Sequence, residues 1–111
     1  MVDYIPQRGH FIRINFNPQA GHEQQGKRPA LVVSYTLFNQ KRGFAFVCPI
    51  SNTERQNPFY IKIPEGLSVT GVIMTDQLRS LDYVVRKAEF LGECPEELLI
   101  KAIARIKRII L

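Results

Sequence analysis

The segment PQAGHEQQGKRPALVVS, residues 18–34, changes character midway from a polar loop to a continuous apolar run. Its second part, read on to PALVVSY (29–35), is rich in β-branched residues and predicts a strand covered on both faces. Its first part, residues 19–28, is longer than the two to five residues of an ordinary hairpin connection. Long loops in compact domains tend to carry function, so this loop is the first place to look for a site.

Outward from this segment, short apolar runs separated by Gly, Pro and polar residues predict further strands. They are HFIRINF (10–16), GFAFVCPI (43–50), NPFYIKIP (57–64), TGVIMTDQL (70–78) and DYVVRKAEFLGE (82–93). The stretch TLFNQKR (36–42) predicts a short turn of helix followed by a polar bend.

The C-terminal segment has a different period. Pro95 fits the first helical position, acidic Glu96 and Glu97 follow, and Lys107 and Arg108 come late, all of which favour a helix dipole. Apolar residues recur at helical spacing and give the helix 96–110 one apolar face: Leu98, Leu99, Ala102, Ile103, Ile106 and Ile110. The fold class is therefore mainly β, a small antiparallel barrel of about six strands with a C-terminal α-helix.

Size and charge narrow the possible functions. The 111 residues suit a single domain, 1–111. The net charge of +5 is concentrated toward the ends, with four basic and no acidic side chains in residues 101–111, which points to an anionic partner; a solvated basic surface is the alternative. The N-terminus lacks the apolar stretch of a signal peptide and no run is long enough to span a membrane, so we expect a cytoplasmic protein with no membrane contact.

The chain shows no pattern of metal or cofactor ligands. Cys48 and Cys94 are far apart, without a CxxC motif or a neighbouring His, and are expected to be free thiols. No paired-carboxylate spacing and no Gly-rich phosphate loop occur. We therefore expect no cofactor and no metal.

Four side chains remain as candidates for chemistry. Arg28 stands where the loop enters its strand, so its planar fork is available to a phosphate; a salt bridge to Glu23 is the alternative. Ser51 ends the run 43–50 and is either a displayed hydroxyl or a turn serine. His22 has a near-neutral pKa suited to proton transfer or is simply solvated. Asp76 interrupts an apolar run and must be paired or catalytic there.

These groups fit metal-free RNA cleavage, in which the ribose 2′-OH attacks the adjacent phosphate. The reaction needs a base for the 2′ proton, a cation for the phosphorane charge and a donor for the leaving 5′ oxygen. Spacing alone does not establish such a site.

Three blocks carry a specific resemblance. GHEQQGKRPALVVS (21–34), VCPIS (47–51) and TGVIMTDQLRSLD (70–82) resemble, in order and at family spacing, the MazF/PemK/Kid family of toxin-antitoxin mRNA interferases. The similarity extends over about residues 7 to 110. It implies an SH3-like (CcdB/PemK-like) barrel that forms a homodimer, cuts single-stranded RNA to 2′,3′-cyclic phosphate and 5′-OH ends, and is blocked by an acidic antitoxin.

The resemblance also implies roles for individual residues. Arg28 matches the catalytic arginine, and Ser51 falls where MazF-type members have a threonine. His22 and Asp76 match residues that act in catalysis or RNA contact in Kid-type members. We expect further RNA contacts from His22, Gln24, Gln25, Lys27, Asn52, Gln77 and Arg79.

Two departures keep alternatives open. Ser51 lacks the methyl group that limits a threonine's rotamers, and Met74 replaces an arginine of the Kid-type members, which favours Arg28 with Ser51 as the catalytic pair. The alternatives are a CcdB-like gyrase-poisoning toxin, although the chain has no Trp and ends in RIIL, and a non-catalytic RNA-binding barrel.

Overall fold

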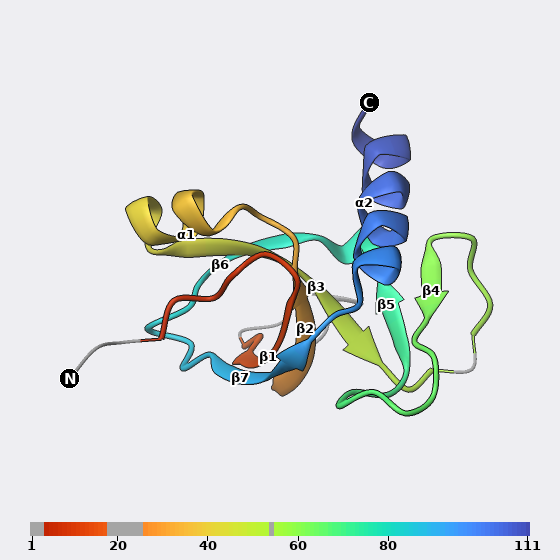
Figure 1. Cartoon of the computed structure of the whole chain (residues 1–111), viewed down its shortest axis with the longest axis horizontal. Helices are drawn as coiled ribbons and strands as arrows, with labels where there is room; N and C mark the ends of the chain where they lie inside the picture. The colour runs from red at the N-terminus through yellow and green to blue at the C-terminus, as the bar shows by residue number, and fades with distance from the viewer. Residues whose placement is uncertain (1–3, 18–25, 54) are drawn as a thin grey trace.

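The computed structural model describes residues 4–17, 26–53 and 55–111 and shows a mainly β protein with two helices (Figure 1). The strands are β1 (His10–Asn15), β2 (Lys27–Val32), β3 (Phe44–Ser51), β4 (Tyr60–Lys62), β5 (Val72–Met74), β6 (Arg79–Asp82) and β7 (Glu89–Glu93). The helices are α1 (Thr36–Arg42) and α2 (Glu96–Ile110), with a short 3₁₀ turn η1 (Thr75–Gln77). The described part thus has seven strands, where the sequence predicted about six.

All strand pairings in the described part are antiparallel. The order is β4-β5-β3-β2-β1-β7, and β6 pairs with β3. The longest strand, β3, pairs with β6 and β2 over its first part and with β5 through Ile50 and Ser51. Because β4 and β7 are edges of this path, the sheet forms a bent, partly open barrel, and the predicted fold class is confirmed.

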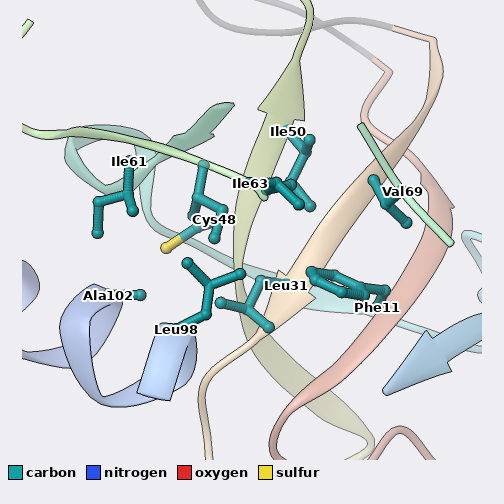
Figure 2. Close-up of a cluster of buried hydrophobic side chains, with 10 residues drawn as sticks. Phe11, Leu31, Cys48, Ile50, Ile61, Ile63, Val69, Leu98 and Ala102 are labelled. Carbon is teal, nitrogen blue, oxygen red and sulfur yellow. The ribbon is translucent and has the colours of Figure 1, made fainter. Parts of the chain in front are cut away.

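Apolar side chains fill both faces of the bent sheet, because successive side chains of a strand point to opposite sides. One cluster, which includes Phe11, Leu31 and Cys48, packs under α2 through Leu98 and Ala102 (Figure 2). The second cluster consists of Ile12, Ile14, Phe16, Ala30, Val32, Ala45, Val47, Leu81 and Tyr83. The β2 segment is therefore covered on both faces, as its continuous apolar run predicts.

The C-terminal helix has the predicted bounds and polarity. Pro95 directly precedes α2, one position earlier than expected, and Glu96 and Glu97 occupy the first turn. The helix also reaches the β3–β4 loop, because Arg105 Nη1 donates a hydrogen bond to the carbonyl oxygen of Pro58 at 2.6 Å. No helix in the described ranges is long and apolar enough to cross a bilayer.

Two predicted strands, 70–78 and 82–93, are wrong in extent. The first is only β5, because Thr75 turns the chain into η1: its Oγ1 donates to the carbonyl oxygen of Phe59 at 2.5 Å, and its N–H donates to the same atom. The second predicted strand, 82–93, instead contains the end of β6, a turn and β7. Asp82 Oδ1 accepts the N–H groups of Val84 and Val85 and so starts the turn.

Candidate active site

The register of β2 against β3 relates Arg28 to Ser51. Ala30 pairs with Pro49 and Val32 with Val47. The β2–β3 pairing ends at Ala30 and Pro49, and Arg28 and Ser51 each lie two residues beyond that pair, at the same end of the two strands. Because side chains alternate along a strand, Arg28 has the face of Ala30 and Ser51 the face of Pro49. Arg28 is exposed and Ser51 half-buried. Two candidates that are 23 positions apart in sequence therefore lie at the same end of neighbouring strands.

The two ends of the loop that precedes Arg28 are tied together. Gly26 N–H donates to Asn17 Oδ1 at 2.8 Å, and Phe16 N–H donates to the carbonyl oxygen of Gly26 at 2.8 Å. Arg86 Nη1 donates to the carbonyl oxygens of Asn15 and Asn17. Asn17 and Gly26, which flank residues 18–25, are therefore held together beside Arg28. The candidates His22, Gln24 and Gln25 in this loop, and the alternative partner Glu23, lie outside the described residues.

Two of the predicted RNA-contacting cations have partners within the protein. Lys27 Nζ forms an ion pair with Glu89 Oε1 at 2.5 Å, which lowers the pKa of the Glu89 carboxyl. Arg79 lies with its guanidinium 5.7 Å from the centroid of the Phe16 ring, and its Nη1 donates to the carbonyl oxygen of Phe16 at 3.2 Å. Lys27 thus links β2 to β7, and Arg79 links β6 to the residue that follows β1. The contact of both side chains with RNA stays a prediction.

The segment around η1 differs from the arrangement the sequence suggested. Asp76 is exposed on η1, where an apolar strand was expected, so its carboxylate does not need a buried partner. Burial raises the pKa of the Cys48 thiol to about 12, and the charge of Asp76 adds to the rise. Cys48 belongs to the cluster under α2, whereas the register directs Arg28 and Ser51 to the opposite face of the strands. A role for Asp76 in catalysis therefore stays a prediction.

Met74 and Gln77 contact each other inside the fold. Met74 is buried in β5, and Gln77 Nε2 lies 3.7 Å from its Sδ. Gln77 Oε1 is buried and has no hydrogen-bond partner in the described structure. Met74 therefore cannot supply the phosphate contact that an arginine would make, and the RNA contact predicted for Gln77 stays a prediction.

A polar hollow of about 680 Å³ begins directly after Ser51. It lies between the β3–β4 loop, β4 and β5, and its lining includes Asn52, Arg55, Tyr60, Lys62 and Thr70. Of these, sequence reasoning had named only Asn52. The alternation of side chains along the predicted strand NPFYIKIP (57–64) could have identified Tyr60 and Lys62, because the two share one face of that strand.

Gly71 fixes the position of Ser51 and Asn52 from the side of β5. It has φ +118°, and a Cβ atom built on it would lie 2.5 Å from the Ser51 carbonyl oxygen and 3.0 Å from Asn52 Oδ1. Asn52 Oδ1 also accepts a hydrogen bond from Thr70 Oγ1 at 3.3 Å. Only glycine allows this close approach. Gly71 lies in the stretch TGVIM (70–74), but the sequence alone did not single it out.

The described residues offer no group of three or more His, Cys, Asp or Glu side chains that could hold a metal ion. Cys48 and Cys94 are free thiols, as predicted, and burial raises the pKa of Cys94 to about 11. The chemistry that these residues can supply is that of a guanidinium, a hydroxyl and polar contacts beside a strand end.

The structure thus places an arginine, a serine hydroxyl and a polar hollow at one end of a small, partly open β-barrel. Residues 7–110 match the family described as PemK-like, MazF-like toxin of type II toxin-antitoxin system, and the chain belongs to that family. The resemblance predicted from the three sequence blocks is thereby confirmed, and the family favours the interferase over the CcdB-like alternative.

Individual relatives span nearly the whole chain. The endoribonuclease toxin MazF of Escherichia coli K12 is 38% identical over 101 residues, which cover 89% of this chain and 90% of that protein. The endoribonuclease toxin ChpB of the same strain is 36% identical over 110 residues, covering 94% and 93%. In the crystal structure of MazF from Deinococcus radiodurans, the chain is 41% identical in sequence to this one and matches its fold with a TM-score of 0.93. The match covers 97% of this chain and 98% of that chain. A MazE-MazF crystal structure from the same organism gives 34% identity and a TM-score of 0.85, with 97% of each chain covered.

Proposed function

We propose that this chain is the toxin of a type II toxin-antitoxin pair and acts as a sequence-specific, metal-independent endoribonuclease on single-stranded mRNA. The observation that carries the proposal is the position of Arg28 and Ser51 at the same end of the neighbouring strands β2 and β3, on a fold shared with endoribonuclease toxins. The 111 residues act as one toxin domain.

In the proposed reaction one P–O bond forms, another P–O bond breaks, and two protons are transferred. The ribose 2′ oxygen attacks the adjacent phosphorus, the bond from phosphorus to the 5′ oxygen breaks, and a 2′,3′-cyclic phosphate and a 5′-OH form. Arg28 stabilises the added charge on the phosphorane, and the Ser51 hydroxyl donates to a non-bridging oxygen. A base takes the 2′ proton and an acid protonates the 5′ oxygen, roles for which His22 and Asp76 are the candidates.

The polar hollow after Ser51 gives the RNA a path away from the cut. Tyr60 is half-buried and offers a ring on which a base can stack, while Lys62 is exposed and can reach a phosphate. The amide of Asn52 can bond a base edge. We infer that nucleotides next to the cleaved bond occupy this hollow and supply part of the sequence preference.

The partners follow from the same assignment. We propose that the protein is a homodimer that binds single-stranded RNA and an acidic antitoxin in the cytoplasm. The net charge of +5 favours both anionic partners, and MazF of Deinococcus radiodurans has been crystallised with MazE.

The test is cleavage of a long RNA by the purified protein in EDTA, with the 5′ ends of the products mapped. Arg28→Ala should lower cleavage by roughly two to three orders of magnitude, as expected for loss of a transition-state charge stabiliser. Arg13→Ala is the matched control, because Arg13 is exposed on β1, one residue from the position paired with Arg28 and pointing to the other face.

Each alternative has its own result. Cleavage by the Arg28→Ala protein at the Arg13→Ala rate would remove Arg28 from the mechanism. RNA binding without any cleavage would support the non-catalytic barrel, and gyrase arrest would support the CcdB-like toxin. A substrate with deoxyribose at the cut position should stay intact, because the nucleophile is missing.

A further inference from the structure

The turn that leads into β4 is fixed by hydrogen bonds from within and from outside. We call residues 57–60 the β4 turn. Asn57 forms the inner bonds: its Oδ1 accepts the N–H of Phe59 at 2.8 Å, and its carbonyl oxygen accepts the N–H of Tyr60 at 3.0 Å. The carbonyl groups of Pro58 and Phe59 are bound by residues from other elements.

Two elements bind these carbonyl groups from outside the turn. Thr75 on η1 donates to the Phe59 oxygen through its N–H at 3.2 Å and through Oγ1 at 2.5 Å. Arg105 on α2 donates to the Pro58 oxygen through Nη1 at 2.6 Å. Arg105 is half-buried, whereas Pro58 is exposed. The β4 turn is therefore held between η1 and α2, and Arg105 is its link to α2.

The helix α2 is a fixed base for this link. Leu98 and Ala102 are buried in the cluster beneath the helix (Figure 2), and Ile106, next to Arg105, packs against the same cluster. Hydrogen bonds donated by a guanidinium group are charge-assisted and roughly twice as strong as neutral ones. The position of Pro58 is thus set by a helix that the core holds in place.

The β4 turn borders the polar hollow described above. Asn57 and Tyr60 belong to the lining of the hollow, and Lys62 follows on the same face of β4. A shift of Pro58 moves Tyr60 as well, because Tyr60 is bonded across the turn to Asn57. Arg105 is not among the described residues that line the hollow, so it fixes one wall from behind.

We propose that Arg105 is a positioning residue for RNA sequence selection: through Pro58 it holds Tyr60 and the adjoining wall of the hollow in place. The proposal rests on the proposed function, because it takes the hollow as the site of nucleotides next to the cleaved bond. Contacts to base edges require accurately placed groups, whereas contacts to phosphate are the same for every base. Loss of the Arg105 bond should therefore weaken selection among sequences more than it weakens RNA binding as a whole.

The alternative role for Arg105 is direct contact with an RNA phosphate. Such a contact is independent of sequence, and its removal lowers the slope of log Kd against log salt concentration by about one unit. A side chain that acts by bonding a protein carbonyl group leaves this slope unchanged. The salt dependence of binding thus separates the two roles.

The test selects bound sequences from a random pool of RNAs of about 12 nucleotides, with Ser51→Ala protein so that the RNA stays uncut. The bound fraction is sequenced, and the enrichment of each base at each position of the selected motif measures selection. Arg105→Ala and Arg105→Lys are added to this background; lysine keeps the charge but lacks the planar fork. The matched control is Arg108→Ala, which removes the same charge from an exposed position of α2.

A second readout reports the β4 turn without RNA. The N–H groups of Phe59 and Tyr60 both bond to Asn57, so their hydrogen exchange, measured by NMR, follows the order of the turn. Arg105→Ala should speed this exchange at least about fivefold relative to Arg108→Ala. The melting temperatures of the two variants should agree within about 5 °C, because the core contacts of α2 are kept.

We expect Arg105→Ala to lower the enrichment of at least one motif position at least about fivefold, and Arg105→Lys to restore part of it. The Kd for the whole pool and its salt slope should match those of Arg108→Ala. Equal enrichment in Arg105→Ala and Arg108→Ala, or faster exchange without any loss of enrichment, overturns the proposal. A salt slope lower by about one unit in Arg105→Ala alone assigns Arg105 to phosphate contact instead.

Failure of the proposed function gives a different result. Wild-type protein would then leave a long RNA uncut in the cleavage assay, while the selection on Ser51→Ala protein still decides the role of Arg105 from binding alone. If protein with Arg105 intact enriches no motif, the hollow does not select bases and the proposal is refuted, whether or not the wild type cuts RNA.

Discussion

Replacing Gly71 by Ala tests whether the close approach of β5 to β3 positions the Ser51 hydroxyl. The new Cβ atom would lie 2.5 Å from the Ser51 carbonyl oxygen and 2.9 Å from its carbonyl carbon, so one of the two backbones must move. The positive φ of +118° costs about 1–3 kcal/mol for a side chain, and overpacking adds about 1–3 kcal/mol. The sum of roughly 2–6 kcal/mol is a large part of a typical unfolding free energy of about 5–15 kcal/mol.

Gly66→Ala is the matched control. Gly66 also has a positive φ, +93°, but a Cβ atom there would meet nothing within 4 Å. The Gly66→Ala variant therefore has the backbone strain of a positive φ without a close contact to another residue. The difference between the two variants isolates the displacement of Ser51 and Asn52.

The assay is steady-state cleavage of an RNA substrate, at a temperature well below the melting temperature of each variant. A misplacement of about 1 Å at a reacting group can cost about a hundredfold in rate. We therefore expect Gly71→Ala to lose at least about tenfold in kcat with KM changed less, and Gly66→Ala to keep the wild-type kcat. Equal kcat for the two folded variants, whatever their melting temperatures, would refute the positioning argument.

Three further predictions concern the site, its partner and stability. Ser51→Ala should slow RNA cleavage and Ser51→Thr should preserve it, because threonine keeps the hydroxyl; equal rates for all three proteins would reduce Ser51 to a turn residue. If the acidic antitoxin competes for the groove, adding it to Ser51→Ala protein loaded with RNA should release the RNA from an intact dimer, and its association rate should fall with salt; a stable ternary complex by mass photometry would contradict this. Burial lowers the pKa of His10, whose Nδ1 accepts the Tyr4 hydroxyl at 2.6 Å, so the unfolded chain binds the proton first and the unfolding free energy should fall as pH drops from about 7 to 5.5. His10→Gln should flatten that slope in urea titrations, and an unchanged slope would exclude His10 as its source.

Local sequence patterns were sufficient to predict several of the strands and the C-terminal helix. The alternation in 10–16 and the apolar runs at 29–35 and 43–50 predicted β1, β2 and β3, because the period of side chains along a strand is a local property. The helical spacing after Pro95 predicted α2 with its observed bounds for the same reason. Arg28 and Ser51 could be proposed as candidates because each stands at the boundary between an apolar run and a polar segment, and their roles stay predictions.

Contacts between distant segments decided the rest. Thr75 belongs to an apolar run, yet its hydrogen bonds to Phe59 turn the chain out of the strand. Asn39 is buried and Leu37 exposed because Pro6 and Tyr83, 33 and 44 positions away in the sequence, supply hydrogen-bond partners that no window around α1 contains. Sequence spacing gives the number of residues between two groups, whereas their separation in space depends on strand register and on which atoms compete for each polar group. The placement of Arg28 and Ser51 at the same end of β2 and β3 and the approach of Gly71 to Ser51 are therefore properties of the folded barrel.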